Sequence, residues 1–207
     1  MRSDFRRLAS DKNFTSGYKA YYPLSASPAM SQIIGIGTQV LPELMALMES
    51  SSDPQFRKAL LFIIAHVDDS KSEETLISAL NDDDLNGLAA YLLGNYRYRS
   101  SSGEYNKPEN FIRDKDKILK ALLPLLKNTR EYFIDADGFE AKPHVGDIAI
   151  ASFIRIGGLK NFNIDQSRYR WIGWEILEFT DEERKELINA IEKYILTAKS
   201  ATNISLY

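Results

Sequence analysis

From residue 38 onward, the chain alternates between segments with apolar residues at helical spacing and short polar turns. Apolar residues recur three and four positions apart between Thr38 and Glu49, a spacing that places them on one face of a helix. Asp53-Pro54 then predicts the start of a second helix that reaches Val67, because Asp suits an N-cap and Pro the first helical position. This second helix is apolar on nearly all sides, which predicts burial in the middle of a stack.

A second helical pair is predicted over residues 73–81, capped by Ser72, and 85–95, with an acidic turn at 82–84 between them. The second of these helices carries a stripe of small residues on one face: Gly87, Ala90 and Gly94. Because glycine lowers helix stability, two glycines in one helix indicate that a neighbouring helix approaches closely. We therefore expect tight packing against another helix of the core.

A third pair is predicted over residues 114–127 and 144–156. Pro124 should kink the first member, and the loop between the two helices is unusually long for a helical hairpin. Further along, Thr180 and Glu183 have the spacing of a capping box, which predicts the start of a last helix. No segment shows sustained two-residue alternation of apolar and polar residues, so no sheet is expected.

The first helical pair resembles a HEAT repeat. That family has a Pro in its first helix, an Asp at the turn, and an apolar-Arg pair at the opening of its second helix. Pro42, Asp53 and Phe56-Arg57 match these positions in order. The other two units depart from the pattern, since Asn86 and Gly146 stand where the repeat has its arginine.

Residues 145–157 are similar to the second helix of the same repeat, so the resemblance covers residues 38–158. It implies an all-α fold, a right-handed α–α superhelix of three to four HEAT-like helical hairpins. We expect a single domain over residues 1–207, with an N-terminal arm at 1–37 and a C-terminal capping region at 159–207. The first thirty residues are expected to be irregular or partly helical, because Pro23 and Pro28 should break any longer element.

Composition is typical of a globular protein, with 44% hydrophobic and 27% charged residues among 207, so disorder is not expected. The net charge of −3 argues against nucleic acid, whose binding draws on an excess of Lys and Arg. The absence of cysteine excludes disulfides and thiolate chemistry. No apolar run approaches the ~20 residues that cross a bilayer, and no secretory signal is recognisable. We therefore expect a cytoplasmic protein without a membrane partner.

The sequence contains no recognisable catalytic motif. Gly35-Ile36-Gly37 lacks the third glycine of a dinucleotide loop and is interpreted as a turn. His66 lies on an apolar helix face and neither histidine has an acidic residue beside it in the sequence, so both are predicted to be structural. Asp135, Asp137 and Glu140 lack the spacing of a calcium loop and are interpreted as a solvated turn, with cation binding left open. No catalytic residue, metal site or cofactor is assigned.

Two segments combine arginine with large aromatic side chains, the residue types that most often anchor protein interfaces. We predict that these residues contact a partner: Arg97, Tyr98, Arg99, Tyr105, Arg168, Arg170 and Trp171. Arginine with aromatics also stacks on single-stranded bases, and Trp171 could instead pack at the end of the helical stack. The net charge favours a protein partner over nucleic acid.

These observations lead to one principal hypothesis and one alternative. The first is a non-enzymatic protein-binding or scaffold module that uses the curved surface formed by the second helices of the hairpins and their loops. The alternative is a HEAT-like DNA-binding or DNA glycosylase-type protein, which would hold DNA against basic residues on those helices. Residues 85–95 contain no basic residue and residues 145–157 only Arg155, which weakens the alternative.

Overall fold

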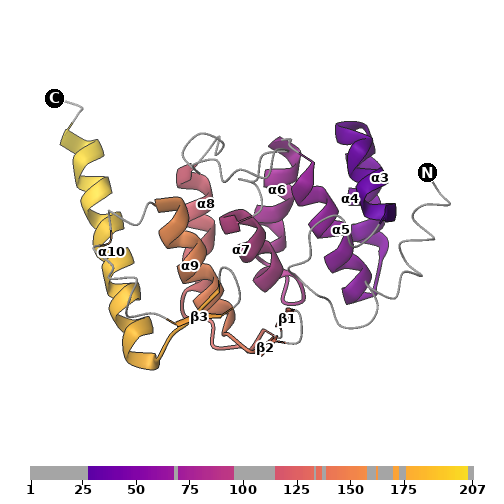
Figure 1. Ribbon diagram of the computed structural model, residues 1–207. Coiled ribbons are helices and arrows are strands. Elements are labelled where there is room, and N and C mark those ends of the chain that lie inside the picture. The colour runs from indigo at the N-terminus through magenta and orange to yellow at the C-terminus, as the bar shows by residue number, and fades with distance from the viewer. Residues whose placement is uncertain are drawn as a thin grey trace.

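The computed structural model describes eight segments of the chain: residues 28–67, 70–95, 115–132, 134–136, 139–157, 162, 170–172 and 176–204. In these segments the helices follow one another from α3 at one end of the molecule to α10 at the other (Figure 1). The helices are α3 (Pro28–Gly35), the 3₁₀-helix η2 (Gly37–Val40), α4 (Leu41–Ser50), α5 (Pro54–His66), α6 (Ser70–Ala79), α7 (Asn86–Asn95), α8 (Lys115–Leu122), the 3₁₀-helix η5 (Leu123–Leu125), α9 (Val145–Gly157) and α10 (Asp181–Ile204). The predicted all-α class fits this architecture.

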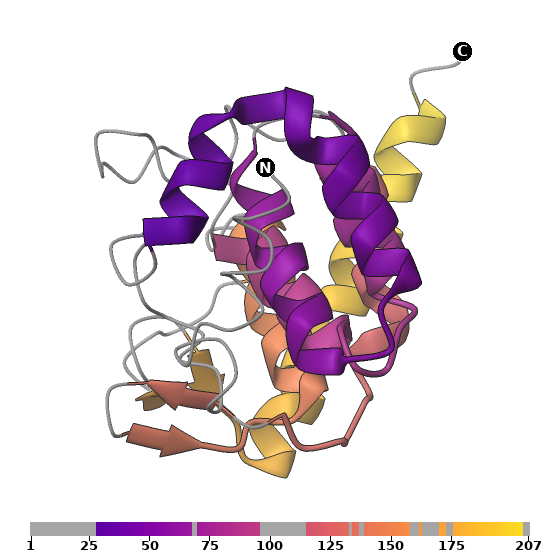
Figure 2. The same ribbon diagram turned by 90° about the vertical axis from the view of Figure 1, so that its right-hand side faces the viewer.

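Three antiparallel helix pairs, α4–α5, α6–α7 and α8–α9, form the body of the protein. Helix α7 packs against both α5 and α9, so the second helices of the pairs make a continuous inner row. Helix α3 packs on α5, and α10 packs on α9 at the far end of the row. Figure 2 looks along the row and shows the pairs lying behind one another.

Two short β-hairpins accompany the helices, and here the expectation of no sheet is wrong. Strand β1 (Ile134–Ala136) pairs with β2 (Phe139–Ala141), and β3 (Arg170–Ile172) pairs with β4 (Ile176–Glu178). Strands of three residues are too short to show a two-residue alternation in the sequence. Tertiary contacts support at least one of them, because β4 packs against α9.

Local capping explains where several helices begin. The Asp53 carboxylate accepts the backbone N–H of Gln55 at 2.9 Å and that of Phe56 at 3.4 Å, which confirms the predicted N-cap of α5. The predicted capping box of α10 is also confirmed. Glu183 N–H donates to Thr180 Oγ1 at 3.3 Å, and Thr180 N–H donates to Glu183 Oε2 at 2.8 Å.

Three local predictions need correction. Pro28 starts helix α3 inside the region interpreted as an irregular arm, because a proline is tolerated in the first helical turn. Ser72 does not cap α6, which already begins at Ser70; its hydroxyl instead donates to the Val67 carbonyl at 2.7 Å. Pro124 does not kink a continuous helix, since α8 ends at Leu122 and a 3₁₀ turn follows.

The inner row of helices is buried almost completely. In α5 every residue from Ala59 to Ala65 is buried, as are all residues of α7 from Asn86 to Gly94. Helix α9 is buried throughout except at Arg155. The predicted middle-layer position of α5 is thus confirmed, and α7 and α9 share it. None of the described helices is both long and apolar enough to cross a membrane.

Candidate functional site

Burial of the inner row changes where a partner could bind. The sequence suggested that the second helices of the hairpins offer a curved binding surface. In the structure α7 is buried from Asn86 to Gly94, α9 is buried except at Arg155, and α5 is buried from Ala59 to Ala65. The first five residues of α5 are partly or fully exposed, so the accessible parts of the described chain are the outer helices, the start of α5, the turns and α10.

Polar contacts link successive hairpins near the N-terminal ends of the inner helices. Arg57 of α5 pairs with Asp82, which lies in the turn before α7. Arg130 Nη2 donates to the Asn86 side-chain oxygen of α7 at 2.5 Å. Beyond them, Asp147 of α9 pairs with Arg184 of α10. Since hydrogen bonds to charged groups are stronger than neutral ones, these contacts fix the spacing between neighbouring hairpins.

Opposing effects set the pKa of Asp82. Partial burial raises it, but the hydrogen bond and charge of Arg57, together with the backbone N–H groups of Asp84 and Leu85, outweigh that effect. The pKa of Asp82 therefore lies below its ordinary value of 3.8. Ionised Asp82 is thus better stabilised in the folded chain than in the unfolded chain.

Arg57→Met should test this link through its pH dependence. A group with a depressed folded pKa contributes stability above its unfolded pKa, and the contribution is lost as pH falls through the folded pKa. We expect the free energy of unfolding of the variant to be lower than that of the wild type by about 1 kcal/mol or less at pH 7, because the pair is partly exposed. Urea unfolding of the variant and the wild type at pH 7 and at roughly pH 3 should show this difference shrinking in acid. A difference that grows in acid would contradict it.

The Asp147–Arg184 pair joins α10 to α9. Asp147 is 1% exposed, and its carboxylate accepts Arg184 Nε at 2.6 Å and Nη2 at 3.1 Å. The same carboxylate accepts the backbone N–H of His144 at 3.1 Å, which closes the N-terminal turn of α9. Arg184 also donates to Asp181 Oδ1 at 2.6 Å and to the Phe179 carbonyl at 3.1 Å. The hydrogen bonding of the Arg184 guanidinium to the Asp147 carboxylate is the main cause of the raised pKa of Arg184.

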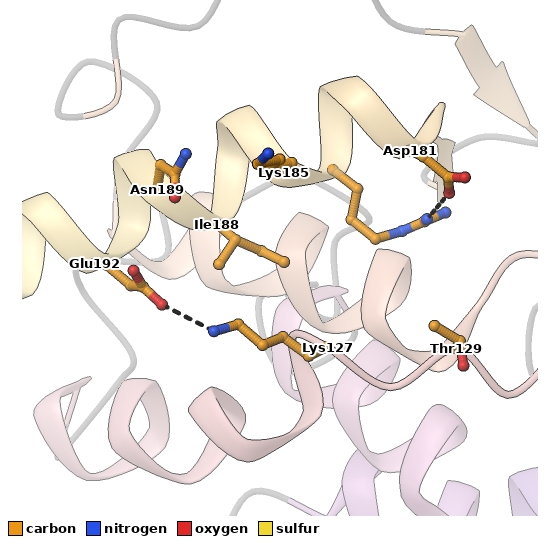
Figure 3. A pocket seen from close by; sticks show the side chains of 8 residues that line it. Lys127, Thr129, Asp181, Lys185, Ile188, Asn189 and Glu192 are labelled. Carbon is orange, nitrogen blue, oxygen red and sulfur yellow. Dashed lines mark hydrogen bonds and ion pairs between the residues drawn. The ribbon is translucent and has the colours of Figure 1, made fainter.

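A pocket of about 390 Å³ lies between α10 and the segment that follows η5. It is lined by Lys127, Thr129, Asp181, Arg184, Lys185, Ile188, Asn189 and Glu192. Figure 3 shows Lys127 and Glu192 at one end of the pocket, paired at 3.2 Å between Nζ and Oε1, and Asp181 at the other, with Ile188 between them. Asp181 pairs with Arg184. Lys185 has no ion-pair partner among the described residues.

The predicted partner-binding residues are only partly placed. Arg97, Tyr98, Arg99, Tyr105 and Arg168 lie outside the described residues. Arg170 and Trp171 lie on β3, where they pair with Glu178 and Leu177 of β4. Glu178, the strand partner of Arg170, comes three residues before Asp181, which lines the pocket.

The pocket residues themselves were not predicted. They come from two segments far apart in the sequence, and no local pattern connects Lys127 with Glu192. One signal was present, because Asp147 is the only acidic residue in a mostly apolar helix, and a buried carboxylate requires a partner. The sequence did not show which arginine would supply that partner.

The histidines and the acidic turn have local structural explanations. His66 Nδ1 lies 2.8 Å from the Phe62 carbonyl oxygen, consistent with the predicted structural role. His144 does have an acidic neighbour in space, since its Nδ1 lies 3.8 Å from Asp147 Oδ2. Asp135 and Glu140 are opposite each other in the backbone register of β1 and β2, whereas Asp137 lies outside the described residues. Within the described segments no group of three His, Asp or Glu side chains could hold a metal ion.

No family model, curated protein or solved structure matches the chain. The resemblance to HEAT repeats therefore remains a prediction from the residues themselves. The pocket beside α10 is a hollow in the exposed surface of the described residues, lined by charged and polar side chains and Ile188.

Proposed function

We propose that the chain is a non-enzymatic protein-binding or scaffold module, a right-handed superhelix of HEAT-like hairpins that binds its partner through the pocket beside α10. The observation that carries this proposal is the composition of the pocket. Side chains of both charge signs surround one aliphatic side chain, Ile188. Protein segments, which carry charged and apolar side chains together, are complementary to such a lining.

The position of the pocket also supports binding of a partner. Its α10 wall is anchored by the buried Asp147–Arg184 pair, so that wall is held in place before a partner arrives. A preformed site avoids part of the ordering free energy that a mobile surface loses on binding. Lys185, which has no ion-pair partner among the described residues, is the charge on this wall that is available to a partner's carboxylate.

The mixed charge of the pocket favours a protein partner over DNA. Binding to a phosphate backbone takes a surface with an excess of Lys and Arg, whereas Asp181 and Glu192 line this pocket alongside its cations. The burial of α5, α7 and α9 also leaves little inner-helix surface against which DNA could lie. We therefore rank the DNA-binding or DNA glycosylase-type function as the second candidate. The protein interaction is proposed to take place in the cytoplasm.

The residues predicted from the sequence fit around this site in part. The β3 residues Arg170 and Trp171 lie on the hairpin that leads into α10, so a partner seated in the pocket could extend onto them. Arg97, Tyr98, Arg99 and Tyr105, together with Arg168, remain proposed contacts of the same interface or of a second one.

Lys185→Glu should weaken binding of the partner while leaving the fold intact. An exposed lysine contributes little to stability. Reversing its charge at an interface places like charges together and should weaken binding by on the order of 1–3 kcal/mol. Quantitative affinity capture with the wild type and the variant, followed by calorimetry with the protein recovered, measures the effect.

The matched control is Lys193→Glu, which makes the same charge change at an exposed position of α10 outside the pocket. The proposal requires a protein retained by the wild type and Lys193→Glu but lost with Lys185→Glu. If all three proteins retain the partner equally and the Arg97→Ala/Arg99→Ala variant loses it, the interface lies instead at the segment that contains Arg97 and Arg99. Tight DNA binding that weakens steeply with salt would instead support the alternative.

A further inference from the structure

Residues 128–132, which follow η5, form an extended segment that is hydrogen-bonded along one edge. Every second residue bonds through its main chain to residues 143–146. The bonds run from Gly146 N–H to the Asn128 carbonyl at 2.8 Å, from Val145 N–H to the Arg130 carbonyl at 2.9 Å, and from Tyr132 N–H to the Pro143 carbonyl at 2.8 Å. Because only alternate residues of an antiparallel strand bond to a given neighbour, the main-chain groups of Thr129 and Glu131 are directed to the opposite edge.

That opposite edge is unpaired among the described residues. The N–H and C=O groups of Thr129 and Glu131 make no hydrogen bond with any described residue, and both residues are exposed. Glu131 stands opposite His144 in an antiparallel register. Ile134 of β1 stands opposite Ala141 of β2 in that same register. The segment therefore runs in register with β1, and its unpaired edge can serve as a template for one more strand.

The side chains of this segment point alternately toward α7 and toward α10. Arg130 Nη2 donates to the Asn86 side chain of α7 at 2.5 Å, and the Tyr132 ring packs against the same helix. Thr129 instead lines the pocket beside α10 (Figure 3). Directly opposite residues of paired strands share one face. On an added strand, the side chains opposite Thr129 and Glu131 therefore lie on the side of the pocket.

We propose that the partner protein binds by adding an extended segment to this edge as a β-strand. The segment places an acidic side chain at Lys185 and, two residues away, an apolar side chain at Ile188. Its main chain exchanges hydrogen bonds with Thr129 and Glu131, which supply affinity, while the pocket selects the side chains. This inference rests on the proposed function, because it states which part of a partner the pocket takes.

The charge and spacing of the pocket lining are complementary to such a segment. Lys127 and Arg184 are engaged in ion pairs, so among the described residues Lys185 is the pocket cation left for a partner's carboxylate. Lys185 and Ile188 lie one helical turn apart, about 4.5 Å along the axis of α10. Side chains two residues apart in a strand are about 7 Å apart, so one acidic and one apolar side chain can reach these two neighbours.

Binding of a synthetic peptide to the full chain tests the inference. The peptide is about eight residues long, within the usual length of a strand, with threonine at every second position and glutamate alternating with valine between them. Fluorescence anisotropy of the labelled peptide should show saturable binding, which is lost when lysine replaces glutamate or when the peptide N–H groups are methylated. Absence of binding, or equal binding of either modified peptide, would overturn the inference. The proposed function is judged separately, by the capture experiment with Lys185→Glu.

Glu131→Pro and Glu131→Ala form a matched pair of variants. Both remove the carboxylate, but only proline also removes the main-chain N–H, and an edge strand tolerates proline where that N–H is unpaired. Glu131→Pro should weaken binding of the peptide about fivefold or more, the effect of one lost hydrogen bond, whereas Glu131→Ala should bind at least as tightly as the wild type. Equal affinities of the two variants would overturn the added strand, even where Lys185→Glu weakens binding and so supports the pocket.

Two measurements without the peptide complete the test. The urea unfolding midpoints of Glu131→Pro and Glu131→Ala should agree, because the N–H that proline removes is unpaired. A much lower midpoint for Glu131→Pro would show that this edge is bonded within the fold, which overturns the inference. Sedimentation of the wild type should show a monomer. Dimers that disappear in Glu131→Pro would assign the edge to a second copy of the chain and would also overturn it.

Discussion

Gly94→Leu should destabilise the protein by about 2 kcal/mol or more, because overpacking a close helix contact forces the backbones apart. A Cβ at Gly94 would lie 2.6 Å from the Cβ of Ser152 and 2.8 Å from its Cα. The second of these atoms belongs to the backbone of α9, so a change of rotamer cannot relieve the overlap. Urea unfolding of the variant against the wild type measures the loss.

Two further variants make this test specific. Gly35→Ala adds a methyl group where no atom lies within 4 Å, so it should be neutral or stabilising by up to about 1 kcal/mol. Gly94→Ala alone should already destabilise, and adding Ser152→Gly should restore part of the loss by removing the hydroxyl and Cβ. An unchanged unfolding midpoint for Gly94→Leu would show that α7 and α9 are not in the described contact.

The small-residue stripe shows which features of this fold are readable from sequence. Two glycines in one helix indicated a close neighbour, and the structure identifies Tyr132 beside Gly87 and Ser152 beside Gly94. The caps at Asp53 and Thr180 were equally readable, since a cap involves residues within one turn of each other. Features encoded over a few neighbouring residues were therefore predictable.

Features that depend on residues far apart in the sequence could not be predicted. Pro28 was interpreted as a breaker although it starts α3, and a proline in the first turn looks the same in sequence as one in a loop. The two hairpins have strands of three residues, below the length at which periodicity is informative. The pocket depends on α10 docking beside Lys127, a long-range contact that no local pattern encodes.

The largest loss of stability that we expect comes from breaking the contact between α10 and α9. Arg184→Met should destabilise the folded chain by roughly 3–5 kcal/mol, the range for leaving one charge of a buried pair uncompensated. Asp147 is 1% exposed, so water cannot replace the hydrogen bonds from Arg184 Nε and Nη2. Two contacts with His144 would remain to Asp147, the backbone N–H at 3.1 Å and the ring Nδ1 at 3.8 Å, and neither replaces the permanent charge of the guanidinium.

The loss of stability in each variant should depend on how deeply the affected carboxylate is buried, not on how many ion pairs are removed. Asp181→Ala removes another partner of Arg184, but the Asp181 side chain is 93% exposed, so about 1 kcal/mol or less is expected. Asp147→Asn combined with Arg184→Met should recover much of the loss of Arg184→Met alone, because the buried charge is then absent. Chemical unfolding of the three variants measures these losses of stability. A loss in Asp181→Ala as large as that in Arg184→Met would refute the prediction.

Hydrogen exchange should reveal how the loss is distributed. Helix α10 lies at the end of the stack and packs on α9, so it can open without the rest of the stack. In Arg184→Met we expect faster amide exchange over residues 181–196, while amides of α5 and α7 keep most of their protection. A uniform loss of protection would mean that α10 unfolds only together with the stack. In that case the pocket wall would be as stable as the core itself.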